Sequence, residues 1–186
     1  MFHRLLGALP TAVFVGGLTM AAWAAARNLV ANPSFEKVEK AKVGEPREVP
    51  TEWRFYVIVM PAADRADTST AHTGKTSFHF SLGEKAKAFL HSAAFPVTTG
   101  TKYRVRVWAK GQGSLGLEML WWKRYPENIA MCEHHRDAKE PVKAAADWKV
   151  IEATFTAPEE ATKAYLRLVG VNGDLWVDDV EVTAQS

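Results

Sequence analysis

Residues 102–111, KYRVRVWAKG, decide the fold class of this chain. Every second position is apolar: Tyr103, Val105, Val107 and Ala109. The positions between them carry cations and a tryptophan: Arg104, Arg106, Trp108 and Lys110. Because successive side chains of a β-strand point to opposite faces, this pattern predicts a strand with one face in a core and the other in water.

Similar segments recur along the chain, separated by Gly, Pro, Asp and Asn. We expect about nine strands, at residues 29–30, 53–60, 77–82, 88–95, 103–110, 115–122, 148–156, 163–171 and 175–183. The only helical feature expected is a turn near residues 139–146. About nine short strands without regular helices predict an all-β fold, either a β-sandwich or a jelly roll.

The first 26 residues have the organisation of a signal peptide. Arg4 precedes an apolar run, and Ala24 and Ala26 supply the small residues of an A-x-A site, so cleavage is expected before Arg27. The alternative is an uncleaved anchor, because residues 5–26 are long enough to span a bilayer. We expect a secreted or periplasmic domain over residues 27–186, with no membrane contact after cleavage.

Charge and cysteine content restrict the function classes. The net charge of +2 and the absence of a long Lys/Arg run exclude an evident nucleic-acid site. The single cysteine, Cys132, cannot form an internal disulfide. We expect a free thiol there, with pairing between chains or metal binding as alternatives.

The sequence has none of three common catalytic motifs, and its one candidate transition-metal motif is weak. The chain has no G-x-S-x-G, H-E-x-x-H or P-loop motif, so we predict that it is not an enzyme. Residues 131–137, MCEHHRD, gather metal-ligand residue types, but no second cluster with zinc-site spacing exists. A polar loop is expected, and a periplasmic metal binder using Cys132, His134 and His135 is the alternative.

Six pieces of sequence, in order, resemble the carbohydrate-binding module group of families 4 and 9, a galactose-binding-like jelly roll. They are NLVANPSFE (28–36), Trp53, HTGKTSFHFSL (72–82), TTGTKYRVRVWAKG (98–111), DWKVIEATFTAP (147–158) and NGDLWVDDVEV (172–182). The resemblance implies a non-catalytic sugar-binding fold. It also implies that Trp53, Trp148 and Trp176 are packing residues.

The same resemblance implies one structural calcium that joins the first strand to the last. The matching positions are Glu36 and Asp178, completed by backbone carbonyls near Ser34 and Lys75. Carboxylates mixed with carbonyl oxygens are the ligands that calcium prefers. The alternatives are that both acids are ordinary surface or turn residues, or that Asp179 replaces Asp178, since a bulge exchanges the two faces of a strand.

A sugar site needs an aromatic platform with polar side chains around it. Alternation predicts one sheet face that carries Trp108, Trp122, Tyr165, Arg104, Arg106, Arg167 and Glu118, with Tyr125 in the loop that follows. The arginines would suit acidic sugars, or they form a solvated face. Equally, each aromatic residue is open to a packing role.

The resulting hypothesis is a secreted module that binds a glycan or polysaccharide. The alternative is an envelope or extracellular structural module that binds another protein. That alternative predicts a broad apolar patch with an open strand edge.

Overall fold

The computed structural model of the protein describes residues 27–41, 47–123 and 133–185. The signal peptide, the ligand role of Tyr125 and the free thiol of Cys132 concern residues outside these ranges and stay predictions. None of the described residues is helical, so the expected turn near residues 139–146 is wrong. Strand β10 (Val142–Lys143) follows Pro141 there and pairs with residues 114–115, because proline interrupts helices and the extended chain gains a strand partner. Consequently no helix in the described part is able to cross a membrane.

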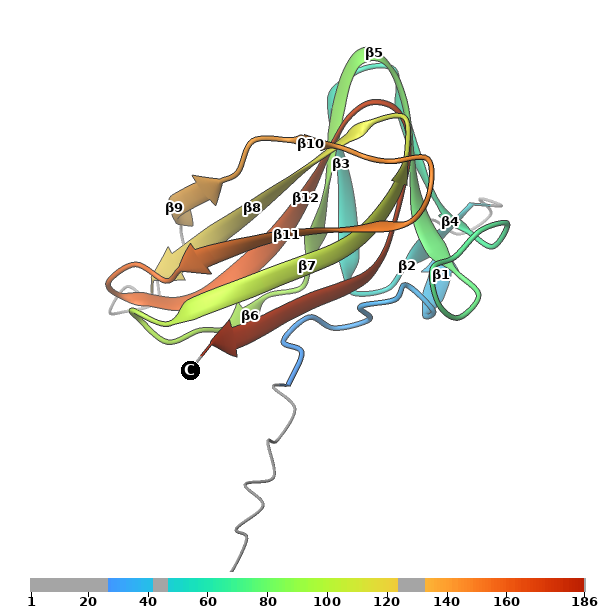
Figure 1. The fold of residues 1–186 in the computed structure, drawn as a ribbon. Helices are drawn as coiled ribbons and strands as arrows, with labels where there is room; N and C mark the ends of the chain where they lie inside the picture. Colours follow the sequence, from blue (N-terminus) through green and yellow to red (C-terminus); the bar gives the residue numbers. More distant parts are fainter. Residues whose placement is uncertain (1–26, 42–46, 124–132, 186) are drawn as a thin grey trace, which may run out of the picture.

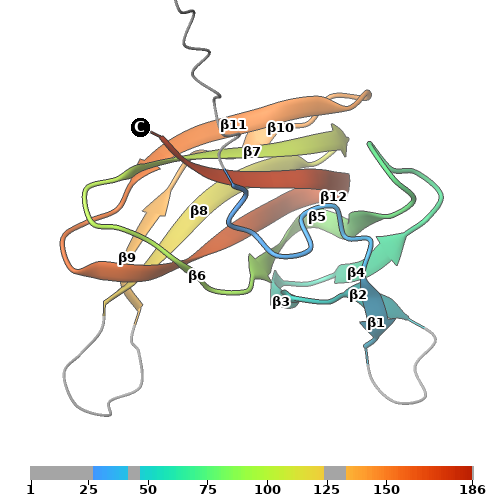
Figure 2. The same ribbon diagram turned by 90° about the horizontal axis from the view of Figure 1, so that it is seen from below.

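The strands form two antiparallel layers that share two long members (Figures 1 and 2). Strand β5 (Ser77–Ser92) and strand β12 (Ala161–Gln185) each run through both layers. The first layer joins β3 (Trp53–Val59), residues 87–92 of β5, residues 161–171 of β12, β8 (Ser114–Lys123) and β9 (Glu133–Ala138). The predicted β-sandwich is therefore confirmed.

The second layer contains the other halves of the shared strands. It joins β4 (Ala62–Asp67), residues 77–82 of β5, residues 175–185 of β12, β7 (Lys102–Gly111) and β11 (Lys149–Thr156). A separate hairpin pairs β1 (Val38–Lys40) with β2 (Glu48–Pro50), and the short β6 (Phe95–Pro96) pairs with β12.

The two shared strands explain the main differences from the predicted strands. Segments 77–82 and 88–95 are halves of β5, and segments 163–171 and 175–183 are halves of β12. Each strand bends at residues with positive φ, Lys85 (φ 63°) in β5 and Asn172 (φ 56°) and Gly173 (φ 70°) in β12. Asparagine and glycine tolerate that conformation better than most residues, so the chain turns the corner without leaving the strand.

The core lies between the two layers. Tyr103, Val105, Val107 and Ala109 of β7 are buried, as the alternation predicted. Residues 29–30, expected as the first strand, are not assigned as one, although Leu29 donates its N–H to the Val182 carbonyl (2.9 Å). Phe35 is fully buried against Trp53 and Phe78, so the NPSFE turn is packed into the core.

Candidate functional site

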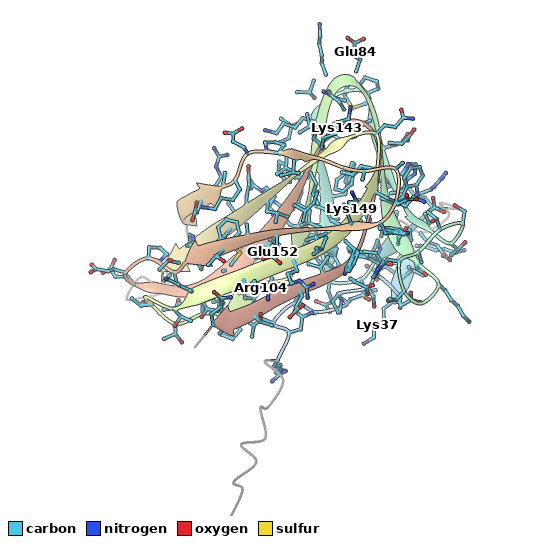
Figure 3. The ribbon with its side chains drawn as sticks, in the orientation of Figure 1. Lys37, Glu84, Arg104, Lys143, Lys149 and Glu152 are labelled. Atoms are coloured by element: carbon cyan, nitrogen blue, oxygen red, sulfur yellow. The ribbon has the colours of Figure 1, made fainter. Side chains whose placement is uncertain are left out.

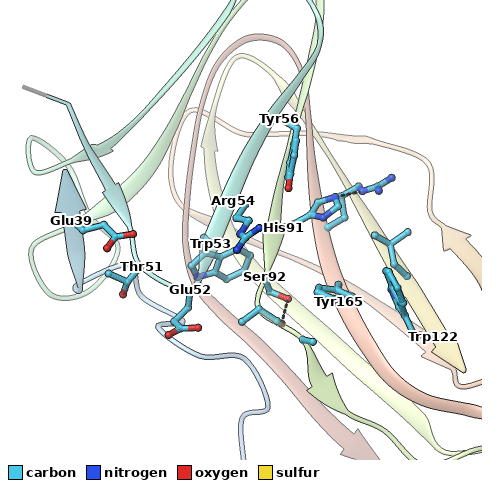
Figure 4. Close-up of a pocket in the computed structure, with 14 residues that line it drawn as sticks. Glu39, Thr51, Glu52, Trp53, Arg54, Tyr56, His91, Ser92, Trp122 and Tyr165 are labelled. Atoms are coloured by element: carbon cyan, nitrogen blue, oxygen red, sulfur yellow. Dashed lines mark hydrogen bonds between the residues drawn. The ribbon is translucent and has the colours of Figure 1, made fainter. Parts of the chain in front are cut away.

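A groove with a volume of about 780 Å³ lies on the outer face of the first layer. Four adjacent strands supply its floor: β3, β5, β12 and β8. We call this site the groove; its principal lining residues are Glu52, Arg54, Tyr56, His91, Trp122, Tyr165 and Arg167. Figure 4 shows Glu39 and Glu52 toward one end, Tyr165 and Trp122 toward the other, and His91 with Tyr56 between them.

The strand register places four polar residues in one row across the groove. Arg54 of β3 lies opposite His91 of β5. His91 lies opposite Arg167 of β12, and Arg167 lies opposite Glu118 of β8. Because directly opposite residues of antiparallel strands have neighbouring side chains on one face, these four side chains form a continuous polar row.

Aromatic rings flank this polar row. On one side, the Trp122 and Tyr165 rings lie 5.3 Å apart with their planes tilted by 53°. On the other side, Tyr56 contacts the rings of Phe89 (5.4 Å) and His91 (5.1 Å). A polar strip between aromatic surfaces is the arrangement that suits a ring with apolar faces and a hydroxyl rim.

Arg167 is held on three sides within the groove floor. Its Nη1 donates to Glu118 Oε2 (3.0 Å), its Nε donates to His91 Nε2 (2.6 Å), and its guanidinium lies 4.3 Å from the Phe89 ring centroid. Only 13% of the Arg167 side chain and 11% of the Glu118 side chain are exposed. Burial and then the Arg167 charge lower the pKa of His91 to about 4, so His91 is neutral at pH 7.

The described lining of the groove carries no excess of positive charge. Its lining includes two carboxylates, Glu39 and Glu52, and two arginines, Arg54 and Arg167. Glu118, next to Arg167 in the polar row, compensates the Arg167 charge. A site that selects anions needs an excess of cations, and this lining does not supply one.

The single binding face predicted from alternation is wrong, because its members belong to two layers. Trp122, Tyr165, Arg167 and Glu118 lie on the first layer. Trp108, Arg104 and Arg106 lie on β7, in the second layer, with their side chains on its outer face. The outer faces of the two layers point away from each other, since the core lies between them. Only Trp122, Tyr165 and Arg167 line the groove, with Glu118 bound to Arg167.

The arginines of β7 are engaged by acids of the neighbouring strands. Arg104 donates to Glu152 (2.7 Å), and Figure 3 labels both side chains on adjacent strands. Arg106 donates to Glu181 (3.3 Å). These contacts explain the basic positions of β7 as a salt-bridged outer face.

Trp108 is covered on the same outer face. The His72 ring stacks on it with the ring centroids 3.9 Å apart and the planes 14° apart, and the His72 and Trp148 ring centroids are 5.8 Å apart in an edge-to-face arrangement. His72 Nδ1 also contacts Asp179 Oδ2 (2.6 Å). A ligand role for Trp108 stays a prediction, and it would require a ring face that His72 does not cover.

The two carboxylates expected at a calcium site meet one loop. Glu36 Oε1 accepts hydrogen bonds from the N–H groups of Lys75 (2.8 Å) and Thr76 (2.9 Å). Asp178 Oδ2 accepts from the N–H groups of His72 (2.8 Å) and Thr73 (3.3 Å). Asp178 is fully buried, and this burial raises the pKa of its carboxyl to about 6.

The neighbourhood of these acids matches the predicted strand geometry. A register shift lies between Asp178 and Glu181, and Asp179 has a φ of 45°, so the bulge considered from sequence is present. Pro33, next to Ser34, accepts the Val180 N–H (2.8 Å), which ties the first segment to the last strand.

The described residues contain no group of three His, Cys, Asp or Glu side chains able to hold a metal. The backbone of Glu133, His134 and His135 forms part of β9, where a loop had been expected.

An exposed apolar run occupies the edge of the first layer. Tyr56, Val57, Ile58, Val59 and Met60 are each at least 41% exposed. Residues 56–59 end β3, the last strand of the layer, and Met60 follows directly after it. This is the feature that the protein-binding alternative predicts, and Tyr56 connects the run to the groove.

Comparison with solved structures gives the fold. The module TmCBM61, solved in complex with beta-1,4-galactotriose, superposes with a TM-score of 0.52 at 22% identity, over 86% of this chain and 99% of its own. The CBM22-1 xylan-binding domain of Paenibacillus barcinonensis Xyn10C superposes with a TM-score of 0.55 at 12% identity, over 86% of this chain and 96% of its own. The chain has the fold of the carbohydrate-binding modules.

A third structure shows the same fold inside a larger protein. The enzymatically active domain of bacteriophage CBA120 tailspike protein 4 superposes with a TM-score of 0.61 at 12% identity, over 85% of this chain. This chain spans only 21% of that tailspike chain. No protein-family model matches the sequence. The search of curated proteins also returns no match.

Sequence reasoning missed part of the groove. Arg54, Tyr56 and His91 were not proposed as binding residues. Alternation in WRFYVIVM (53–60) places Arg54 and Tyr56 on one face, and the same period in FLHS (89–92) pairs Phe89 with His91. That signal shows shared faces within a strand, but not that the two strands are neighbours.

Proposed function

We propose that this chain is a non-catalytic module that binds an uncharged glycan in the groove. The observation that carries the proposal is the polar row Arg54–His91–Arg167–Glu118 flanked by the Trp122–Tyr165 pair and by Tyr56. Sugar rings stack their C–H faces on aromatic rings and direct their hydroxyls to polar side chains. The fold similarity supports this function.

The charges of the groove favour a neutral ligand over an acidic one. Arg167, the buried cation of the floor, is already compensated by Glu118. Arg54 shares the lining with Glu39 and Glu52. The arginines that suggested acidic sugars, Arg104 and Arg106, pair with acids on the other layer.

Among the described residues, the groove floor has no free carboxylate, which supports binding rather than catalysis. Glycoside hydrolysis uses two carboxyl groups placed across the scissile bond. Glu118 is held in its ion pair with Arg167, and the two exposed acids of the lining, Glu39 and Glu52, lie together toward one end of the groove, away from Trp122 and Tyr165.

Calorimetry with neutral oligosaccharides tests the site. Xylo-, gluco-, manno- and galacto-oligosaccharides would be titrated into the wild-type chain, Tyr165→Ala and Trp108→Ala. Loss of one stacking ring from the groove is expected to weaken binding about tenfold in Tyr165→Ala, whereas Trp108→Ala should retain wild-type affinity. Binding lost only in Trp108→Ala would show that the site lies on the second layer. The absence of a heat of binding with every sugar would refute a glycan-binding role.

We also propose that calcium binds at the loop that Glu36 and Asp178 contact. The donor set fits: two carboxylates, one of them fully buried, receive only backbone N–H hydrogen bonds among the described residues. Backbone carbonyls near Ser34 and Lys75 would supply further oxygen ligands, and the ion would neutralise the buried charge. Thermal unfolding in chelator and in excess calcium tests this, and an unchanged midpoint would contradict it.

The site of action proposed is outside the cytoplasm, in the periplasm or the extracellular medium, in keeping with the predicted signal peptide. A protein partner in the envelope is the second candidate. The exposed run of residues 56–60 favours it, and no comparison supports it. Charge substitution in that run, Ile58→Asp, would weaken such an interaction and leave glycan affinity intact.

A further inference from the structure

The groove floor contains a chain of two hydrogen bonds, the relay, which ends at His91, a lining residue of the groove. Glu118 accepts from Arg167 Nη1 (3.0 Å), and Arg167 Nε donates to His91 Nε2 (2.6 Å). The three residues come from β8, β12 and β5 and lie directly opposite one another. Both hydrogen bonds therefore follow from the register of three adjacent strands.

The direction of the Arg167–His91 hydrogen bond determines the His91 tautomer. A guanidinium group has only donors, so His91 Nε2 must be the acceptor. A neutral imidazole whose Nε2 accepts carries its hydrogen on Nδ1. His91 lines the groove, and its Nδ1 is not among the buried polar atoms that lack a partner in the described part of the chain. The Nδ1–H is consequently open to a bound ligand.

We infer that His91 is a specificity-determining donor of the groove, held as the Nδ1–H tautomer by Arg167, and that Arg167 and Glu118 are positioning residues. This inference rests on the proposed glycan-binding function. The Nδ1–H donates to a ligand oxygen, a hydroxyl or ring oxygen of the sugar. Arg167 acts through His91 and does not receive an anion.

The groups around His91 support a neutral ring over a wide pH range. Arg54 on β3 and Arg167 on β12 lie opposite it, the rings of Tyr56 and Phe89 contact it, and Glu118 is the acid beyond Arg167. Protonation of His91 would place a second cation against Arg167, and it would remove the acceptor for the Arg167 Nε–H. Burial and the Arg167 charge accordingly lower the pKa of His91 to about 4.

The relay is tested first without any sugar. Two-dimensional ¹⁵N NMR of the imidazole side chains in the full chain distinguishes the two tautomers. A protonated Nδ1 with an unprotonated Nε2 for His91, unchanged between pH 7 and pH 5, is expected. A protonated Nε2, or titration of His91 near its ordinary pKa, would overturn the inference whatever the chain binds.

The specificity role is tested with matched variants at His91. His91→Phe keeps a stacking ring and removes the donor, so affinity for the neutral oligosaccharide that binds best should fall roughly tenfold. His91→Gln keeps an acceptor for Arg167 and a donor for the sugar, so it should recover most of that loss. Equal affinity in His91→Phe and the wild type would overturn the role of His91 while leaving the proposed function intact.

Two further results separate the inference from the proposed function. An oligogalacturonate that binds more tightly than its neutral galactose counterpart would contradict the uncharged ligand of the proposed function, whereas the NMR measurement would still decide the relay. Absence of binding to every sugar overturns both. Because the NMR measurement needs neither a ligand nor a variant, the relay stays falsifiable even where a substitution impairs folding.

Discussion

The carboxylates of Glu36 and Asp178 accept hydrogen bonds from the same loop, although the two residues lie near opposite ends of the chain. Glu36 receives the N–H groups of Lys75 and Thr76, and Asp178 receives those of His72 and Thr73. The loop that precedes β5 is thus connected to the first segment and to the last strand. The free energy of unfolding should therefore depend on the ionisation of these carboxyl groups, and so on pH. It should also depend on whether the loop has room for a larger side chain.

The buried carboxyl of Asp178 should make stability fall as pH rises. Its pKa is raised by burial from 3.8 to about 6, so the folded state binds the proton more tightly than the unfolded state does. The contribution of this group is fully present below pH 3.8 and is lost as pH rises to about 6. Without a bound cation the loss amounts to about 3 kcal/mol.

Urea unfolding in chelator at pH 4 and pH 7 measures this effect, with Asp178→Asn as the comparison. The stability of the wild type relative to the variant should decrease by about 2.4 kcal/mol between the two pH values, because the unfolded chain is already partly ionised at pH 4. Added calcium should restore it at pH 7, since a cation favours the ionised form. A difference between wild type and variant that does not change with pH would contradict the assignment.

Asp67 should have the opposite pH dependence. Burial disfavours its charge, but hydrogen bonds from Ser69, Trp176 and Arg65 outweigh burial and lower the pKa of Asp67. Its contribution is therefore present above pH 3.8 and is lost as pH falls below that value. Asp67→Asn should destabilise the chain by about 2 kcal/mol at pH 7 and by less at pH 2.5. A loss that is equal at both pH values would argue for a packing role alone.

Gly74 occupies a position where the loop passes directly over the Glu36 carboxylate. Its φ is +64°, and a Cβ there would lie 2.3 Å from Glu36 Oε1. Gly100 has a similar φ of +74° with nothing within 4 Å of the corresponding Cβ. Gly100→Ala should cost about 1 kcal/mol from backbone strain alone, and Gly74→Ala about 3 kcal/mol from strain and the displaced carboxylate. Denaturant unfolding compares them, and equal losses would show that the contact with Glu36 is unimportant.

Asn32 combines an unusual backbone conformation with a capping side chain. Its φ is 47°, its Nδ2 donates to the carbonyls of Lys37 (2.8 Å) and Thr51 (2.9 Å), and its Oδ1 accepts the Lys37 N–H (3.1 Å). Asn32→Gly removes the hydrogen bonds and should cost about 2 kcal/mol, whereas Asn32→Ala adds the strain of the left-handed conformation and should cost about 3 kcal/mol. A glycine variant less stable than the alanine variant would refute this account.

Several features of the fold could be predicted because they depend on local periodicity. The alternation of β7 correctly placed Tyr103, Val105 and Val107 in the core. The ends of β5 and β12 could not be predicted in the same way. Positive φ at Lys85, Asn172 and Gly173 lets each strand continue through a bend, whereas glycine, asparagine and charged residues read locally as a break.

The candidate site was only half predictable. Trp122, Tyr165, Arg167 and Glu118 were correctly placed together, since β8 and β12 pair as neighbours. Trp108, Arg104 and Arg106 were wrongly added to them. His91 and Arg54 were missed, because their position in the polar row depends on the register of strands distant in the sequence.

The sequence by itself determined which side chains of each strand face the core, because the two-residue period of a strand assigns every residue to one of two faces. It did not determine which layer a strand joins. Trp108 and Trp122 both have outward positions, yet β7 belongs to one layer and β8 to the other. Only the tertiary structure decided that the outward faces of these strands point in opposite directions, and that Arg54 and His91 join Arg167 and Glu118 in one row. Strand pairing across long stretches of chain depends on the packing of the whole core, which no local pattern records.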